Sequence, residues 1–378
     1  MEEIPEREIF LRLYPGIEYK KCKICGKSGV IAEILGICID CLYERNEEAL
    51  NIIRDIHGRI RQEYGLPEEV PQEGDKECPL CVNRCKPKPE EKGLCGVRKG
   101  AENGVTPIYG TRAPLDWYHD PLPTNCVAEW VCAARGVGWP EYSYSRSTER
   151  GYTNLAVFYR GCSFNCIFCQ NWHFRLKEGE FLTPSELASK VDRRTACICY
   201  FGGDPAPLSW HSIATSLIAR DREKVRILRF CWETNGSINP RIMRRISEIA
   251  LKSGGTVKID LKAFTPSLHY ALTGASNEWT LENIEFLASL IPRRGKPPIL
   301  VVSTLLVPGY VGPREVDKIS KFLYKLNPDI PYSLLAFYPH FYAHDLPRTS
   351  RAHAMACREV ALKNGLRNVH IGNVGLLW

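Results

Sequence analysis

The hydrophobic pattern of the chain changes at residue 153. From there on, short apolar runs such as 155–159 and 299–306 alternate with longer stretches whose apolar residues recur at helical spacing. Short continuous apolar runs are typical of strands buried on both faces of a parallel sheet. The alternation predicts an α/β fold, a partial (β/α)6 barrel. The predicted strands are 155–159, 196–201, 226–233, 256–261, 299–306 and 332–337, with 367–371 as a further candidate, and the predicted helices include 184–192, 208–220, 240–252, 279–290 and 314–326.

The first 152 residues lack this alternation. A helical pattern covers residues 44–64, and residues 67–75 form an acidic linker with prolines. Residues 108–152 are rich in glycine and aromatic residues without regular spacing, so we expect a loop-rich lid there, with a small core around the tryptophans as the alternative. The predicted domains are a zinc ribbon plus helix over 1–66, a cysteine-rich module and aromatic lid over 67–152, and the barrel over 153–378.

Many of the cysteines lie in groups whose spacing suits metal binding. Two C-x2-C pairs separated by twelve residues predict one tetrahedral zinc ion, with four unrelated cysteines as the alternative: Cys22, Cys25, Cys38 and Cys41. A second group has four sulfurs within eighteen residues and predicts either zinc or a second iron–sulfur cluster, between which the spacing does not decide: Cys78, Cys81, Cys85 and Cys95.

Apart from three cysteines near residue 165, which are described below, the remaining cysteines are expected to be small buried side chains. For two of them, Cys126 and Cys132, completion of a metal site is the alternative. The others on strand or helix patterns are expected in the core: Cys197, Cys199, Cys231 and Cys357.

Composition limits the class of protein. The chain has 378 residues, of which 44% are hydrophobic, so it can bury a sizeable core. No apolar run approaches the roughly eighteen residues of a membrane helix, and the start shows no signal-peptide pattern, so we expect a cytoplasmic protein without membrane contact. Seventeen cysteines, an odd number, indicate a reducing compartment and metal sites rather than disulfides. The net charge of +7 permits an acidic partner or RNA and requires neither.

One loop carries the strongest chemical signal. It directly follows the apolar run 155–159 and contains Cys162, Cys166 and Cys169 in C-x3-C-x2-C spacing. Three thiolates on one short loop can each hold one iron of a cubane cluster and leave the fourth iron open for chemistry. The alternative is a zinc site that takes its last ligand from elsewhere.

This loop resembles the signature of the radical S-adenosylmethionine (SAM) superfamily, and within it the activating enzymes of pyruvate formate-lyase and their archaeal and bacterial relatives. The resemblance covers roughly residues 76–373, and the second cysteine group is similar to that of a radical SAM branch found beside Memo-like and AMMECR-like proteins. It implies that SAM chelates the fourth iron of a [4Fe-4S] cluster. Cleavage of SAM would yield a 5′-deoxyadenosyl radical that abstracts hydrogen, with Phe168 against the adenine.

Further motifs follow the predicted strands, where β/α barrels form their active sites. The turn after the second strand, Gly202-Gly203-Asp204-Pro205, resembles the family motif that binds the methionyl amino group, although the family more often has Glu where this chain has Asp204. Asp260 and Lys262 would contact the ribose and carboxylate of SAM, with a buried salt bridge as the alternative. The resemblance also implies cofactor contacts for Glu233, Asn235, Ser303 and His340.

The resemblance implies hydrogen abstraction from a C–H bond, with a protein as the leading substrate and a ferredoxin or flavodoxin as the one-electron donor. We expect C-methylation with cobalamin, as in the methylases that modify methyl-coenzyme M reductase. Large apolar surfaces for a corrin are expected from Trp117, Tyr118, Trp130 and Trp139. The alternatives are activation of a glycyl-radical enzyme, tRNA modification, which is not favoured, and a metal-binding scaffold without activity.

Overall fold

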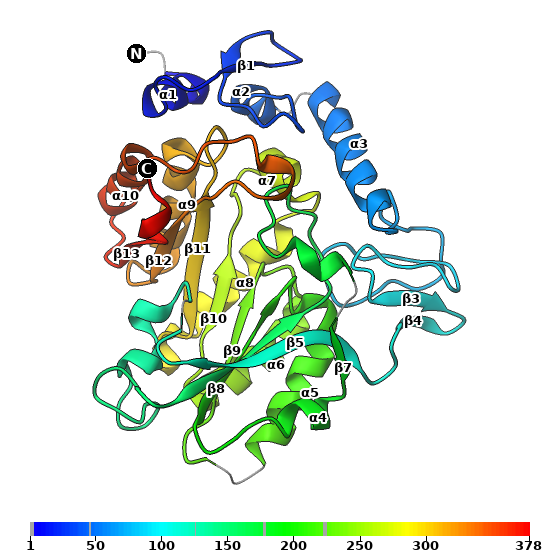
Figure 1. Cartoon of the computed structure of the whole chain (residues 1–378), viewed down its shortest axis with the longest axis vertical. Coiled ribbons are helices and arrows are strands. Elements are labelled where there is room, and N and C mark those ends of the chain that lie inside the picture. Colours follow the sequence, from blue (N-terminus) through cyan, green and yellow to red (C-terminus); the bar gives the residue numbers. More distant parts are fainter. Residues whose placement is uncertain (1–3, 45–46, 125, 177–178, 222–224) are drawn as a thin grey trace.

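The computed structural model describes residues 4–44, 47–124, 126–176, 179–221 and 225–378. A nine-stranded sheet runs through the molecule in the order β13-β12-β11-β10-β9-β8-β6-β5-β7 (Figure 1). Seven of its strands are parallel, and they confirm the predicted α/β fold. These are β6 (Thr153–Tyr159), β8 (Thr195–Gly202), β9 (Arg229–Thr234), β10 (Val257–Asp260), β11 (Leu300–Leu306), β12 (Tyr332–Ala336) and β13 (Val369–Gly372).

Residues 108–152 were expected to be rich in loops, and the structure adds one strand to this segment. Residues 113–121 form β5 (Ala113–Pro121), which pairs antiparallel with β6 from Leu115 opposite Tyr159 to Pro121 opposite Thr153. A short strand, β7 (Glu180–Leu182), continues the sheet beyond β5. The sequence of β5 mixes apolar, acidic and proline residues, so its strand conformation depends on pairing with β6 more than on local preference.

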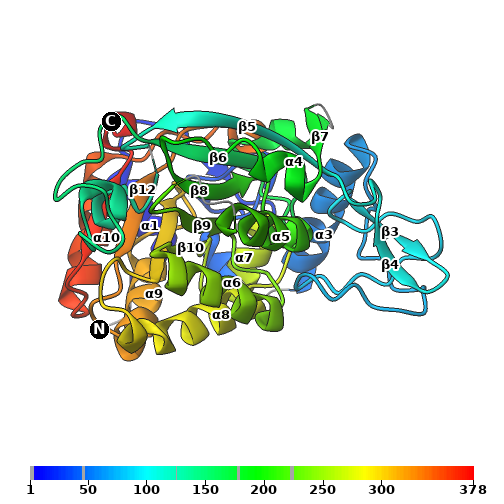
Figure 2. The ribbon, with the colours of Figure 1, turned by 90° about the horizontal axis from the view of Figure 1, so that it is seen from below.

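Helices cover the outer face of the sheet, as Figure 2 shows for α5, α6, α8 and α9. In α6 the apolar residues Met243, Ile246 and Ala250 recur at helical spacing and are fully buried. This is the pattern from which a helix was predicted. The helices of this part are α4 (Pro184–Ala188), α5 (Ser209–Arg220), α6 (Pro240–Ser253), α7 (Pro266–Thr273), α8 (Glu278–Ser289), α9 (Pro313–Leu326) and α10 (Arg351–Lys363).

The N-terminal module packs on the loop that follows β11 and on α10. The hydroxyl of Tyr310 accepts a hydrogen bond from the backbone N of Ala32 at 3.0 Å, and the hydroxyl of Tyr14 lies 2.7 Å from Nδ1 of His353. The module consists of α1 (Glu6–Leu13), β1 (Lys20–Lys21), β2 (Ser28–Gly29), α2 (Ile39–Tyr43) and α3 (Glu47–Glu63), and β3 (Arg98–Ala101) and β4 (Gly104–Pro107) follow it. In the described part of the chain, no helix has both the length and the apolar character needed to cross a bilayer.

The segment after β5 packs against β12 and lines the large cavity at the end of the sheet. The indole Nε1 of Trp130 donates to Ser333 Oγ at 3.1 Å, and Ser333 Oγ donates to the carbonyl of Val127 at 2.7 Å. Deeper in the molecule, the guanidinium of Arg229 and the carboxylate of Glu149 form a fully buried ion pair with a 2.6 Å contact. Trp130 and Glu149 of this irregular segment thus bind polar side chains of β12 and β9, and these interactions hold the segment against the sheet.

Candidate functional site

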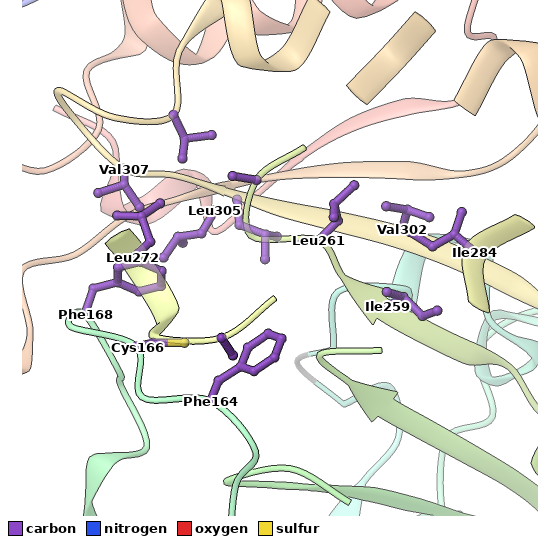
Figure 3. Close-up of a cluster of buried hydrophobic side chains, with 14 of the residues drawn as sticks. Phe164, Cys166, Phe168, Ile259, Leu261, Leu272, Ile284, Val302, Leu305 and Val307 are labelled. Carbon is purple, nitrogen blue, oxygen red and sulfur yellow. The ribbon is translucent and has the colours of Figure 1, made fainter. Parts of the chain in front are cut away.

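The three-cysteine loop is anchored on both sides by the core. Figure 3 shows Phe168 beside Leu272 of α7, with Leu305 of β11 and Val307 close by, and all four residues belong to one buried core. The backbone of the loop is fixed as well, because Asn165 N donates to the carbonyl of Thr273 at 2.7 Å. The apolar residues between the cysteines therefore fix the loop, and the cysteines are left for chemistry.

Cys162, Cys166 and Cys169 all line one cavity of about 780 Å³ at the carboxyl end of the parallel strands. Burial raises the pKa of the Cys166 thiol to about 12, and the positive charge of Lys262 opposes this rise. A bound metal cation favours the thiolate form of such groups. The chemistry of the donor set thus fits an iron–sulfur cluster.

The structure places most of the other predicted cofactor-binding residues in the same cavity: Phe168, Gly202, Gly203, Asp204, Glu233, Asn235, Asp260 and Lys262. Three predicted residues do not line it. Pro205 is the residue directly before a short helical turn (Ala206–Leu208), Ser303 is buried in β11, and His340 lies beyond β12. Their predicted contacts with SAM have no support from the shape of this cavity.

Asp204 ties two of the strand-end turns together. Its Oδ1 accepts hydrogen bonds from the hydroxyl of Thr234 at 2.9 Å and from the backbone N of Asn235 at 2.7 Å. Its Oδ2 accepts one from the backbone N of Ala206 at 2.7 Å. Burial raises the pKa of Asp204 to about 6, although these hydrogen bonds lower it. Asp204 therefore shapes the site by joining the turn after β8 to the turn after β9.

Gly203 is in close contact with the three-cysteine loop. The backbone N of Asp204 donates to the carbonyl oxygen of Gly161 at 2.8 Å. A Cβ built on Gly203 would lie 2.6 Å from that same oxygen and 2.9 Å from the ring of Phe174. The glycine thus permits the approach of one backbone to another, next to Cys162.

Asp260 and Lys262 form an ion pair at the wall of the cavity. The Lys262 ammonium also lies 5.6 Å from the ring centroid of Phe168. The second carboxylate oxygen, Asp260 Oδ1, is buried and has no hydrogen-bond partner among the described residues. Buried acceptors normally have donors, so this oxygen fits a ligand that brings a hydroxyl group, such as the ribose of SAM.

Three aromatic rings from neighbouring strands form one wall. Tyr118 of β5 stacks on Phe158 of β6 at 5.6 Å between ring centroids, and Phe158 stacks on Phe201 of β8 at 5.3 Å. Trp130 lines another part of the cavity and stacks on His370. Sequence analysis missed Phe158 and Phe201, which lie on strands predicted to be wholly buried.

Two of the four aromatic residues expected to hold a corrin lie elsewhere. Trp117 points to the opposite face of β5, where its Nε1 donates to Glu180 at 3.1 Å. Trp139 is 43% exposed and contacts the guanidinium of Arg146. The expectation that all four share one surface was therefore wrong: Trp117 faces away from Tyr118 because alternate residues of a strand face opposite sides, and Trp139 lies outside the strands.

A buried lysine, Lys258, contacts two residues that line the cavity. The ammonium of Lys258, whose side chain is 1% exposed, donates to Cys126 Sγ at 2.7 Å and lies 3.8 Å from Glu233 Oε2. Cys126 and Glu233 both line the cavity. Sequence analysis missed Lys258, but the alternation along β10 offered a signal, since residues 258 and 260 face the same side. The predicted core positions of Cys197, Cys199, Cys231 and Cys357 are confirmed by their burial.

The first cysteine group forms a separate site in the N-terminal module. Sγ of Cys22 lies 3.8 Å from that of Cys41, and Sγ of Cys25 lies 3.7 Å from that of Cys38. The four sulfurs all lie within 4.8 Å of one another. A tetrahedral zinc ion with bonds of about 2.3 Å requires ligand sulfurs roughly 3.8 Å apart, so these cysteines could hold one metal ion.

Comparison with known proteins finds one family model and several relatives that resemble this chain. Residues 156–323 match the Radical SAM superfamily. An uncharacterized protein of Methanocaldococcus jannaschii is 26% identical over 312 residues, which cover 79% of this chain and 81% of the relative. A putative glycyl-radical enzyme activating enzyme of the same organism is 25% identical over 209 residues, or 54% of this chain and 74% of the relative.

Similar solved structures include a domain of a pyruvate-formate lyase-activating enzyme from Bacteroides vulgatus. It has a TM-score of 0.37 and 18% identity, and the match covers 46% of this chain and 98% of that chain. Another is SuiB of Streptococcus suis bound to S-adenosylmethionine, with a TM-score of 0.40 and 12% identity over 56% of this chain and 48% of that chain.

Proposed function

We propose that this protein is an enzyme that cleaves SAM reductively and abstracts hydrogen from a C–H bond of a protein side chain, because residues 156–323 match the Radical SAM superfamily. One observation carries the proposal: the three cysteines line the same cavity as Asp260, whose Oδ1 has no hydrogen-bond partner among the described residues. A [4Fe-4S] cluster on Cys162, Cys166 and Cys169 would supply the electron that breaks the carbon–sulfur bond of SAM.

Each part of the cavity has a role in this proposal. Gly203 allows its turn to approach the three-cysteine loop closely, and Asp204 holds that turn in place. Asp260 and Lys262 bind the ribose and the carboxylate of SAM, and Phe168 lies against the adenine. The rings of Tyr118, Phe158 and Phe201 shield the cavity on one side, which keeps water away from a reactive radical.

For the overall reaction we propose C-methylation with cobalamin as the methyl carrier. Tyr118, Phe158, Phe201 and Trp130 give the cavity a broad aromatic surface, which suits a flat ligand. A second candidate is activation of a glycyl-radical enzyme, which the name of the 25% identical relative favours. We further propose a ferredoxin or flavodoxin as electron donor, zinc at Cys22, Cys25, Cys38 and Cys41, and a cytoplasmic location, since the many cysteines suit a reducing compartment.

Anaerobic assay of the reconstituted enzyme tests these proposals in turn. With SAM and dithionite, the enzyme should form 5′-deoxyadenosine, and a variant with Cys162, Cys166 and Cys169 all changed to Ala should form none. Full product formation by that variant would refute the assignment of the cluster.

The two reactions differ in their products. A methylase supplied with methylcobalamin and a substrate peptide should also form S-adenosylhomocysteine and add the mass of one methyl group to the peptide. An activase should form 5′-deoxyadenosine alone and leave a lasting glycyl radical on its partner. If no corrin binds and no S-adenosylhomocysteine forms, methylation is refuted.

A further inference from the structure

The second cysteine group packs directly against the three-cysteine loop. Nδ2 of Asn83 donates to the carbonyl of Ser163 at 2.6 Å, and the backbone N of Val82 donates to the carbonyl of Ser237 at 3.0 Å. Ser237 Oγ in turn lies 2.6 Å from Ser163 Oγ. The residues between Cys81 and Cys85 are thus hydrogen-bonded to the residue that follows Cys162.

A second contact lies on the other side of the loop. A Cβ built on Gly161 would lie 3.5 Å from the carbonyl oxygen of Cys95 and 3.0 Å from the side chain of Val97. The backbone around Cys95 therefore touches the residue that precedes Cys162. Together the two contacts place the chain of the second group next to the residues that precede and follow Cys162.

The sulfurs of this group are spaced differently from those of the zinc ribbon. Among the residues that the structure describes, Cys22, Cys25, Cys38 and Cys41 are the only group of three or more possible ligand atoms within 4.8 Å of one another. No three sulfurs of Cys78, Cys81, Cys85 and Cys95 are that close, and neither are those of Cys162, Cys166 and Cys169. A single zinc ion requires sulfurs about 3.8 Å apart, whereas a cluster places iron and sulfide between its ligands.

The surroundings of the group suit a negatively charged cluster. Cys78, Cys81 and Cys85 are buried, with 6–7% of each residue exposed. Arg98 is also buried, and its Nε has no hydrogen-bond partner among the described residues. The backbone of Arg98 lies close to the group, because the N of Gly93 donates to its carbonyl at 2.9 Å and a Cβ built on Gly93 would lie 3.7 Å from Cys85 Sγ. A buried guanidinium with an unused donor favours an anion nearby.

We propose that Cys78, Cys81, Cys85 and Cys95 bind an iron–sulfur cluster instead of zinc, and that this cluster passes one electron to the cluster on Cys162, Cys166 and Cys169. In this step the second cluster is oxidised by one electron and the first is reduced by one, and no bond forms or breaks. A flavodoxin or ferredoxin then restores the electron. The transfer rests on the proposed function, whereas the identity of the metal does not.

Cys95 gives an outside donor a place to approach. It is the least buried of the four cysteines and lines a small surface pocket together with Tyr64, Arg160 and Arg175. Arg175 also lines the large cavity. The second cluster would thus lie between the surface and the loop that holds the first cluster.

Metal content tests the first half of the proposal. The full chain, purified anaerobically and reconstituted, should contain about eight iron atoms, as two cubane clusters require, and about one zinc. A variant with Cys81→Ala and Cys95→Ala should keep about four iron atoms and the zinc. The control is Cys357→Ala, a buried cysteine outside all three groups. About four iron atoms and two zinc ions in the wild-type protein would overturn the assignment.

A second variant keeps the test decisive if the first does not fold. Changing Cys162, Cys166 and Cys169 to Ala removes the first cluster alone, so about four iron atoms should remain. A complete loss of iron from this variant would overturn the proposal. Because this readout needs no SAM chemistry, its outcome is independent of the proposed function.

The choice of reductant tests the electron transfer. With reduced flavodoxin, the Cys81→Ala/Cys95→Ala variant should form 5′-deoxyadenosine at least about tenfold more slowly than the wild type. With dithionite, which is small enough to reach the first cluster directly, its rate should change less than about twofold. Equal losses with both reductants would show a structural role only and overturn the transfer step.

Discussion

Replacement of Gly203 by alanine should disturb the three-cysteine loop more than its small size suggests. The new Cβ would lie 2.6 Å from the carbonyl oxygen of Gly161, about 1 Å short of an ordinary contact. That oxygen is held by the backbone N of Asp204 at 2.8 Å, so the alanine cannot turn away and the loop must move. Overpacking of this kind costs roughly 1–3 kcal/mol of stability.

The functional loss should exceed the loss of stability. A displacement of about 1 Å at a reacting centre typically costs on the order of 100-fold in rate. We expect Gly203→Ala to form 5′-deoxyadenosine about 100-fold more slowly and to retain less iron at the Cys162 loop. The assay compares iron content and initial rate in anaerobically reconstituted samples.

The matched control is Gly295→Ala. A Cβ built there meets nothing within 4 Å, and the residue does not require a positive φ. This variant should keep the wild-type iron content and rate. If Gly203→Ala did the same, the close backbone approach would not matter to the site, and the reasoning from its geometry would be refuted.

Three further predictions concern stability and metal content. Arg229→Met should lower the free energy of unfolding by about 3–5 kcal/mol, because it leaves the buried Glu149 carboxylate without its ion-pair partner. Adding Glu149→Leu should restore part of the lost stability. Urea titration measures both variants, and a loss below about 1 kcal/mol for Arg229→Met would contradict the prediction. Burial raises the pKa of Glu6 from 4.5 to about 7, so the wild type loses stability as the pH rises through this range. Glu6→Gln should therefore match the wild type at pH 4 and exceed it by roughly 3 kcal/mol at pH 8, whereas a difference independent of pH would contradict the shift. Cys25→Ala should remove the zinc and lower the Tm while the iron content stays unchanged, and retained zinc would rule out this ligand set.

Features that depend on neighbouring residues in the chain were predictable from the sequence. The apolar runs at 155–159 and 299–306 became β6 and β11, because burial on both faces of a sheet requires continuous apolar residues. The C-x2-C pairs placed Cys22 and Cys41 near one point, since each pair forms a turn that presents two sulfurs. The spacing of Cys162, Cys166 and Cys169 likewise located the cavity before the fold was known.

Features that depend on distant residues were decided by the tertiary structure. Residues 113–121 are a strand because β6 offers an edge to pair with, and nothing in their own sequence requires it. Trp130 packs against β12 because its indole donates to Ser333, more than 200 residues away in the chain. The contact of Asn83 with Ser163 places the second cysteine group against the first loop in the same way. Each of these contacts stabilises the chain only after its ends have been brought together, so no local pattern records it.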